Sequence, residues 1–348
     1  MRITPFDPRG ATDREYAAAT VFWNAMRAEF VPDDPPIPLD ERVQGWRNIP
    51  TFVRVWSWSV WDDEGAAIIA AGTVNFLDKE ENRHLARFDI AVLPEFRQQG
   101  IARRLLSAVA EIPQREERRL LIAASHGSVP AGEAFMRRLG AHMALADHTN
   151  QLDLRELNRD LLALWQERAS QRAADFEIGL WEGELPEEEI EEIAVMFEAI
   201  NRAPLGDLEM EDEHWTPAQI RQFERAARAR GNQTWMMYVR QKGSRKIAGW
   251  TDVSWNPNRP ELLQQQGTAV FPEFQNRGLG RWLKAAMLEK VLRERPQVRY
   301  VRTGNADMNA PMLKINTELW FRPFRSHYTW QVETAKVAEY LRARAATA

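Results

Sequence analysis

The chain contains no cysteine among its 348 residues. This absence excludes disulfide bonds, zinc sites built from thiolates, and a cysteine nucleophile. A chain without disulfides suits a reducing compartment, so we expect a cytoplasmic location. The six histidines are scattered along the sequence without the spacing of metal ligands. We therefore expect no metal site.

Long apolar runs are also missing, because no window reaches about 18 uncharged apolar residues. The first residues, MRITPFDPRGATDREY, contain no apolar stretch typical of a signal peptide. We therefore expect no membrane association. The net charge is −4, and there is no block of Lys and Arg that could neutralise a run of phosphates. These features argue against a nucleic-acid partner.

What the sequence does contain is an internal repeat. Residues 91–102 read AVLPEFRQQGIA, and residues 269–280 read AVFPEFQNRGLG, with six of the twelve positions identical. The offset of 178 residues is about one domain, and the chain length also suggests two domains. Two copies of one α/β unit are the simplest account.

The ends of the two copies match in pattern as well, since 149–169 and 328–345 each read as a strand followed by an amphipathic helix. The polar run at 170–177 is the expected linker. We therefore predict an N-terminal domain at 1–172 and a C-terminal domain at 175–348.

Periodicity predicts the elements of each copy. In the first copy we expect helices at 15–30, 102–111 and 131–139, and strands at 51–60, 67–77, 85–93 and 120–124. In the second we expect helices at 187–199, 217–230, 280–293 and 310–319, and strands at 233–240, 246–255, 265–270, 300–304 and 327–332. This order predicts an α/β (α+β) fold with a mixed sheet.

The segment from Gln275 to Gly280 lies between a predicted strand and a predicted helix. The first N–H groups of a helix have no internal partner, and the helix dipole is positive there. Gly278 and Gly280 allow the backbone to approach an anion closely, and Arg277 and Arg281 add positive charge. The segment is therefore a candidate phosphate cradle, although an ordinary tight turn would also explain two glycines.

The pattern V-x-P-x-x-(R/Q)-x-x-G-x-(G/A) resembles the acetyl-CoA-binding motif of the GNAT acetyltransferase superfamily. The resemblance implies that backbone amides of the loop hold the pyrophosphate of acetyl-CoA, the cosubstrate, and that the preceding strand pairs with its pantetheine arm. In the second copy the implied contacts are Ala269, Val270, Phe271, Gln275, Asn276, Arg277, Gly278, Leu279, Gly280 and Arg281. A second cofactor site in the first copy would use Ala91, Val92, Leu93, Arg97, Gln98, Gln99, Gly100, Ile101 and Ala102.

The resemblance also implies the architecture: two tandem GNAT folds, each a mixed, mostly antiparallel sheet flanked by helices. Mycothiol synthases and several antibiotic-modifying acetyltransferases have a similar two-copy arrangement with unequal copies.

A later family frame reads Asn309, Met312, Asn316, Trp320 and Phe321 in the second copy. Asn316 stands where many members place the tyrosine that protonates the leaving thiolate. An Asn can only donate an N–H to the sulfur, so the resemblance leaves the protonating group open. Asn305, Asn309 and Met312 are implied cosubstrate contacts, although helix capping or a buried hydrogen bond would also explain the asparagines. In the first copy the frame holds Val129 and Met136, so we expect that copy to be degenerate.

Acetyl transfer to an amine requires a neutral amine, a polarised thioester and a stabilised thiolate. The carboxylate nearest to the motif is Asp252, a candidate base that would otherwise be an ordinary surface residue. Tyr328, His327 or water could protonate the thiolate. The family's usual donor to the thioester oxygen is the N–H at Val270.

These features predict a cytoplasmic N-acetyltransferase that acetylates the primary amine of a small molecule. The acidic run 207–213 would suit a cationic acceptor, although a solvated loop is an alternative reading. Two other functions remain open: a catalytically silent acyl-CoA-binding or sensory protein, and an acyltransferase that uses a longer acyl-CoA. We expect a monomer or a homodimer.

Overall fold

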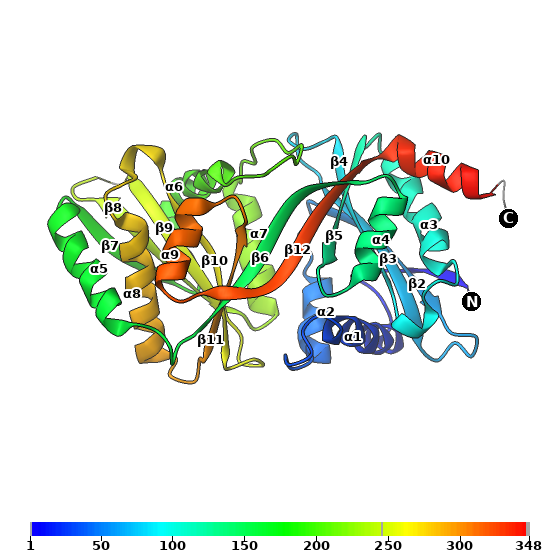
Figure 1. Cartoon of the computed structure of the whole chain (residues 1–348), viewed down its shortest axis with the longest axis horizontal. Helices are drawn as coiled ribbons and strands as arrows, with labels where there is room; N and C mark the ends of the chain where they lie inside the picture. The colour runs from blue at the N-terminus through cyan, green and yellow to red at the C-terminus, as the bar shows by residue number, and fades with distance from the viewer. Residues whose placement is uncertain (1, 245, 346–348) are drawn as a thin grey trace. The chain divides into compact units, whose positions relative to one another are not determined.

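The computed structural model describes residues 2–244 and 246–345. Its chain divides into two units that do not follow the two halves of the sequence (Figure 1). The first unit comprises the chain up to Ala146, the short segment Leu205–Glu211 and the chain from Ser326 on. The second unit comprises Asp147–Pro204 and Asp212–Arg325.

The sheet of the first unit has the strand order β1-β2-β3-β4-β5-β12. Its pairs are antiparallel except β4 with β5, which are parallel. The strands are β1 (Ile3–Phe6), β2 (Val53–Trp61), β3 (Ile68–Leu77), β4 (Leu85–Val92), β5 (Leu120–His126) and β12 (Arg322–Glu333).

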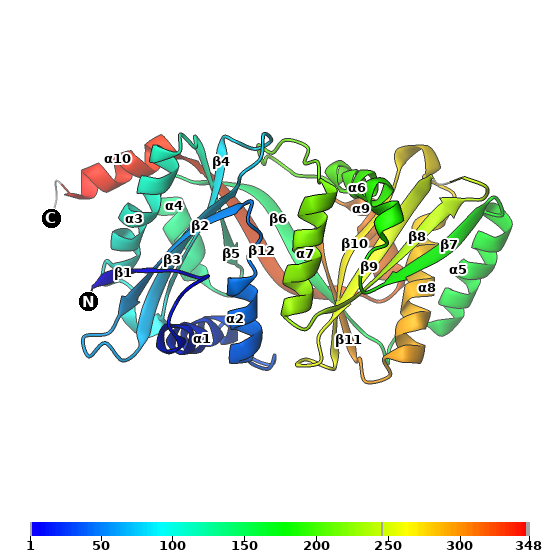
Figure 2. The same cartoon turned by 180° about the vertical axis from the view of Figure 1, so that it is seen from behind.

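Helices cover both faces of this sheet (Figure 2). On one face Phe22 of α1 packs with Ile68 and Ala91. On the other face Leu106 and Val109 of α3 join the larger core. The helices are α1 (Asp13–Ala28) and α2 (Leu39–Arg47) on the first face, and α3 (Ile101–Arg115), α4 (Pro130–Arg138) and α10 (Thr334–Ala345) on the second.

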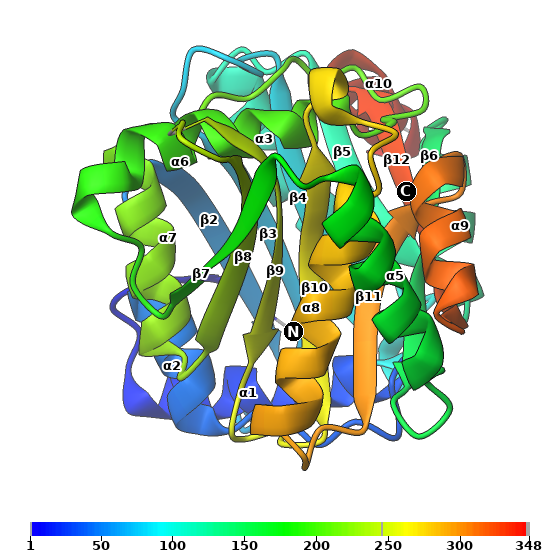
Figure 3. The same ribbon diagram turned by 90° about the vertical axis from the view of Figure 1, so that its left-hand side faces the viewer.

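The sheet of the second unit has the corresponding order β7-β8-β9-β10-β11-β6, again with one parallel pair, β10 with β11. Figure 3 shows α5 and α8 side by side over this sheet. The strands are β7 (Phe176–Glu182), β8 (Gln233–Gln241), β9 (Ile247–Trp255), β10 (Leu262–Val270), β11 (Tyr300–Ala306) and β6 (His142–Asp153). The helices are α5 (Arg159–Arg172), α8 (Leu279–Glu294) and α9 (Ala310–Glu318) on one face, and α6 (Ile190–Phe197) and α7 (Pro217–Ala229) on the other.

The two repeats exchange their final strands. β12 comes from the second repeat but pairs with β5 of the first unit, where Tyr328 lies opposite Ser125. β6 comes from the first repeat but pairs with β11 of the second unit, where His148 lies opposite Asn305. The expected boundary between 172 and 175 therefore separates the two sequence repeats. Each structural unit, by contrast, contains residues from both sides of this boundary. Periodicity reports that a segment is a strand but does not report which sheet edge it joins.

The observed elements confirm the predicted class, a mixed and mostly antiparallel sheet flanked by helices. Each predicted helix and strand has a counterpart in the structure. The predicted helix 187–199 is broken into a 3-10 turn at Glu187–Glu189, α6, and a second 3-10 turn at Glu198–Arg202. Three elements were not predicted: β1, α2 and β7. β7 begins inside the expected linker. This polar segment is too short to show the alternation of apolar and polar residues that is typical of a strand.

Candidate active site

The parallel strands β10 and β11 pair over only three residues each, Leu262–Gln264 with Tyr300–Arg302. Beyond that point β10 continues to Val270 and β11 to Ala306, and no further pair between them is formed in the described chain. Backbone groups that are not used in a ladder remain able to bind a ligand. The second unit therefore has an open strand edge at the carboxyl end of the parallel pair β10–β11.

The loop after β10 has the geometry of an anion cradle. A 3-10 turn (Pro272–Phe274) leads into Asn276 and Gly278, whose φ angles are +63° and +85°. Gly278 is the N-cap of α8, and no side chain caps the helix. The first helical hydrogen bond runs from the N–H of Trp282 to the carbonyl of Gly278, at 3.0 Å. The N–H groups of the first turn are thus left for an anion, which fits the pyrophosphate of acetyl-CoA.

Val270 turns its N–H toward the open edge. The N–H of Phe271 donates to the carbonyl of Ala248 at 2.9 Å, and successive residues of a strand point their N–H groups to opposite sides. The carbonyl of Val270 accepts from Nε2 of Gln275 at 3.2 Å. The predicted strand residues Ala269 and Val270 therefore border the opening.

The two arginines of the loop are paired with carboxylates. Arg277 contacts Asp175 at 3.1 Å, and Arg281 forms two hydrogen bonds of 3.0 Å with Glu318. The Arg281 guanidinium lowers the pKa of the Glu318 carboxyl. The positive charge expected from these side chains is therefore partly neutralised, which leaves the backbone amides as the principal groups that the loop offers to an anion.

A β-bulge interrupts β10 between Gln265 and Thr268, opposite β9. Asp252 of β9 closes the bulge, because its Oδ1 accepts the N–H of Gly267 at 2.8 Å. The position at 267 requires glycine, since a Cβ there would lie 2.4 Å from the ring of Trp250. Burial raises the pKa of Asp252 to about 7. A carboxylate that titrates near neutrality is suited to general base catalysis.

The face of the sheet that α6 and α7 cover carries aromatic side chains beside this bulge. The indole of Trp250 donates to the carbonyl of Met196 at 3.1 Å, and its ring meets Phe197 edge to face at 5.2 Å. Trp250 is 2% exposed. These contacts hold the Trp250 ring in the apolar core on this face of the sheet.

Asn316 lies inside a buried polar cluster. Its Nδ2 donates to Oδ1 of Asn305 at 2.6 Å, and its Oδ1 accepts from Nζ of Lys284 at 2.7 Å. Lys284 also donates to Oε1 of Gln265 at 3.0 Å, and Asn150 donates to Asn305 at 3.4 Å. The structure thus brings together the predicted residues Asn305 and Asn316.

The sequence analysis missed Lys284, Gln265 and Asn150. The available signal was a lysine on an otherwise apolar helix face. Asn309 caps a helix, which was the alternative to a cosubstrate contact. It is the N-cap of α9, and its Oδ1 accepts the N–H of Met312 at 3.4 Å.

The first unit repeats the cradle without the rest of the site. Gly100, with φ of +79°, is the N-cap of α3, and β4 pairs with β5 only over Leu85–Arg87. Arg97 donates to the carbonyl of Val92 at 3.0 Å, as Gln275 does to Val270 in the second unit. However, the pairing of β4 with β3 shows no register shift, so the first unit lacks a bulge at this place. The positions that correspond to Lys284 and Asn316 hold Leu106 and Met136.

Tyr328 belongs to the first unit, whereas Asn316 and Asp252 belong to the second. The reason is the pairing of β12 with β5, which packs Tyr328 against the core of the first unit. In the second unit the equivalent position is His148 of β6, whose Nδ1 bonds to a carboxylate oxygen of Asp307. His327, the other candidate, contacts His126 of the first unit at 3.1 Å.

Most carboxylates of the acidic run 207–213 form hydrogen bonds within the first unit. They contact His142, Arg119 and the N–H of Asn82. The residues that make these contacts are Asp207, Glu209 and Glu211. Most of the run is therefore not available to neutralise a cationic acceptor in the second unit.

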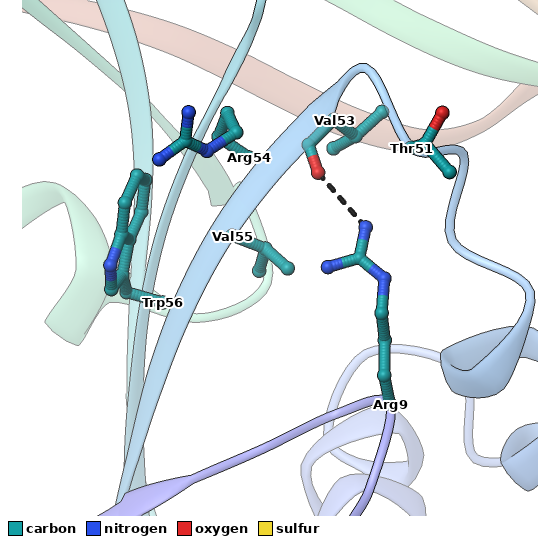
Figure 4. A pocket seen from close by; sticks show the side chains of 6 residues that line it. All are labelled: Arg9, Thr51, Val53, Arg54, Val55 and Trp56. Carbon is teal, nitrogen blue, oxygen red and sulfur yellow. Dashed lines mark hydrogen bonds between the residues drawn. The ribbon is translucent and has the colours of Figure 1, made fainter.

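A surface pocket in the first unit shares no residue with either cradle. It is lined by Arg9, Thr51 and the start of β2, and Arg9 spans it by donating to the carbonyl of Val53 at 3.1 Å (Figure 4). Within residues 2–244 and 246–345, no cluster of three or more acidic or histidine side chains could hold a metal ion. No helix in the same residues has the length and apolarity to cross a bilayer.

Comparisons with known proteins agree with this geometry. Residues 55–140 match the family model for the acetyltransferase (GNAT) domain. A tandem GNAT protein from the clavulanic acid biosynthesis pathway is 25% identical, with a TM-score of 0.74, over 96% of this chain and 98% of that one. Residues 55–140 thus carry an acetyltransferase (GNAT) domain, and nearly the whole chain has the fold of a tandem GNAT protein.

Two further structures share the fold of this tandem GNAT chain. A GCN5-related N-acetyltransferase from Sphaerobacter thermophilus is 13% identical, with a TM-score of 0.66, over 95% of this chain and 96% of that one. The GCN5-related glucosamine N-acetyltransferase region of a fungal multi-domain GH3 β-N-acetylglucosaminidase is 13% identical, with a TM-score of 0.63, over 95% of this chain and 38% of that one. A comparison with curated proteins gives no match.

Proposed function

We propose that the second unit transfers an acetyl group from acetyl-CoA to the primary amine of a small molecule. The observation that carries this proposal is the coincidence, in one unit, of an uncapped helix start, an open strand pair and a bulge closed by Asp252. The first unit has the first two features and lacks the third. We therefore assign catalysis to the second unit.

The proposed roles follow from the positions of the groups. The amides at the start of α8 hold the pyrophosphate, and the N–H of Val270 polarises the thioester oxygen. Asp252 takes a proton from the acceptor ammonium. The free amine then attacks the thioester carbon, so that a C–N bond forms and the C–S bond breaks. An N–H of Asn316 stabilises the CoA thiolate as the C–S bond breaks. The attacking nitrogen then loses its second proton, and this proton reaches the thiolate through solvent, so that the products are the N-acetyl amine and free CoA thiol.

The acceptor in this proposal is a small cationic amine. Alkyl amines have pKa values near 10 and arrive as ammonium ions at pH 7. The carboxylate of Asp252 suits such a group. Because much of the acidic run is bound elsewhere, we expect selection for the amine itself rather than for a high positive charge.

Calorimetric titration with acetyl-CoA tests this assignment on three proteins: the natural chain, Gly278→Glu and Gly100→Glu. A glutamate at position 278 combines backbone strain at positive φ with a charge that repels phosphate. We expect Gly278→Glu to weaken binding to the second unit by at least about tenfold. Gly100→Glu carries the same strain in the first unit and is the matched control.

Binding that survives in Gly278→Glu and is lost in Gly100→Glu would place the acetyl-CoA site in the first unit and refute the assignment. Release of free CoA thiol is then measured with a panel of diamines and amino sugars. Tight acetyl-CoA binding without release for any amine would favour the silent acyl-CoA-binding alternative.

A further inference from the structure

Lys284 is buried without a counter-charge. Its side chain is 1% exposed, and its ammonium group contacts Gln265 of β10, Asn316 of α9 and the ring of Phe321 at 5.3 Å. None of these three groups titrates, and no carboxylate of the described residues forms an ion pair with Lys284. A buried cation with only neutral partners is costly for a fold, so its retention calls for an explanation.

The fold itself does not require a polar group at this position. α3 and α8 each begin after a glycine in the left-handed region, and Leu106 stands as far beyond Gly100 as Lys284 does beyond Gly278. Leu106 and Met136 are 0% and 3% exposed and belong to one apolar core. The same helix pair is therefore held together by apolar contacts in the first unit, and the polar cluster is specific to the second.

Lys284 determines which way the amide of Asn316 points. Because Oδ1 of Asn316 accepts from the ammonium group at 2.7 Å, its NH2 group must face away from Lys284. One N–H of that group donates to Asn305. The other is the donor that the proposed function directs at the sulfur. An ammonium group on the oxygen side of an amide also polarises it and strengthens its N–H groups as donors.

We propose that Lys284 is the positioning residue of this site, which orients Asn316 and places a positive charge behind it so that the CoA thiolate can leave. This inference rests on the proposed function of the second unit. Burial lowers the pKa of Lys284 to about 7. Near neutral pH the amine and the ammonium therefore coexist, and a negative charge that develops at the sulfur favours the ammonium.

The ionisation of bound CoA tests this proposal without any acceptor. CoA is added to the full-length protein, and the ultraviolet absorbance of its thiolate is followed as the pH is raised. The chain has no cysteine, so the thiolate signal comes from CoA alone. We expect the thiol of bound CoA to titrate about one pH unit or more below that of free CoA.

Two variants separate the charge of Lys284 from its shape. Lys284→Met and Lys284→Gln should both bind CoA through the intact loop, while their bound thiol titrates as in free CoA. Leu106→Met in the first unit is the matched control and should keep the full shift. A further variant, the double change Lys284→Leu with Asn316→Met, copies the apolar pair of the first unit. It is used if the single variants fail to fold, and its bound thiol should also titrate as in free CoA.

The outcomes distinguish this inference from the function on which it rests. An unshifted thiol in the natural protein, or a full shift in Lys284→Gln, would overturn the role of Lys284 while leaving CoA binding in place. Failure of the natural protein to bind CoA at all would instead overturn the proposed function. Turnover with an accepted amine adds a third readout, since a positioning role predicts a lower kcat in Lys284→Met with KM for acetyl-CoA nearly unchanged.

Discussion

At the scale of single residues, the site contains two ionisable groups whose pKa values are displaced toward neutrality from opposite sides. Burial raises the pKa of Asp252 to about 7 and lowers that of Lys284 to about 7. Asp252 also closes the bulge, so in the proposed function one side chain both supports the backbone and acts as the base. Groups of this kind are typical of functional sites rather than of structural cores.

Asp252→Asn tests the base directly. The amide can still accept the N–H of Gly267, so we expect the fold to persist while kcat/KM falls by about 10²- to 10⁴-fold. In the natural protein the basic form predominates above pH 7, so the rate should rise with pH through about 7. That rise should be absent in the variant. Rate profiles from pH 5.5 to 9 check this, and an unchanged rise in Asp252→Asn would assign the base to another group.

Lys284 should also make stability depend on pH. Its pKa is lower in the folded protein than in the unfolded chain, so the unfolded state binds more protons between about pH 7 and pH 10. The free energy of unfolding should therefore rise across that window through this group. The double change Lys284→Leu with Asn316→Met should flatten the rise. Urea unfolding at pH 7 and pH 9 measures it, with Leu106→Met as the control, and equal slopes in all three proteins would contradict it.

Sequence reasoning identified part of this cluster and missed the rest for a physical reason. Asn316 was found because a family frame places a polar group at that position, and Asn305 was found because it stands at the end of a predicted strand. Lys284 was missed because a lysine in a helix is usually solvated, and its place on an apolar helix face does not by itself tell which partners it meets. The pairing of Arg281 with Glu318 likewise depends on two helices meeting.

At the scale of elements, the cradle was predictable and the strand exchange was not. A strand, two glycines and a helix lie consecutively in the sequence, so local rules are sufficient to predict the loop at Gly278. The partner of β12 lies about 200 residues away in the chain, at β5, and both copies of the sheet offer an equivalent edge. The alternation of β12 fits either edge, and only the three-dimensional pairing decides between them.

The exchange predicts how fragments behave. A fragment of residues 175–348 lacks β6, so the edge of β11 loses the strand that carries Asn150 and His148. We expect this fragment to be aggregated or poorly folded when it is produced alone. Co-production with residues 1–172 should restore a folded complex, as measured by circular dichroism and gel filtration. A monomeric, cooperatively folded 175–348 fragment would show that β12 can take the place of β6.

At the scale of the whole molecule, the chain contains two units of one fold that differ in their polar side chains. The second has the bulge closed by Asp252 and the buried cluster around Lys284, and the first has neither among its described residues. The repeat in the sequence predicted two copies of one α/β unit, and the resemblance of the loop motif implied the GNAT fold. Val129 and Met136 in the first copy led us to expect that the two copies are unequal. The family model matches residues 55–140, which lie in the first unit, although the polar cluster lies in the second. Similarity of sequence and completeness of the site therefore do not coincide in this chain.

The exchange of final strands also decides where the second unit can be excised. Apart from Leu205–Glu211, the second unit is one continuous stretch from Asp147 to Arg325, and it includes all residues that pair within its sheet. A gene encoding residues 147–325 thus carries the cradle, the bulge and the Lys284 cluster, whereas a cut at the repeat boundary removes Asn150. A designer who wishes to transplant this site should follow the hydrogen-bonded strands rather than the duplication, with the cut placed inside β6.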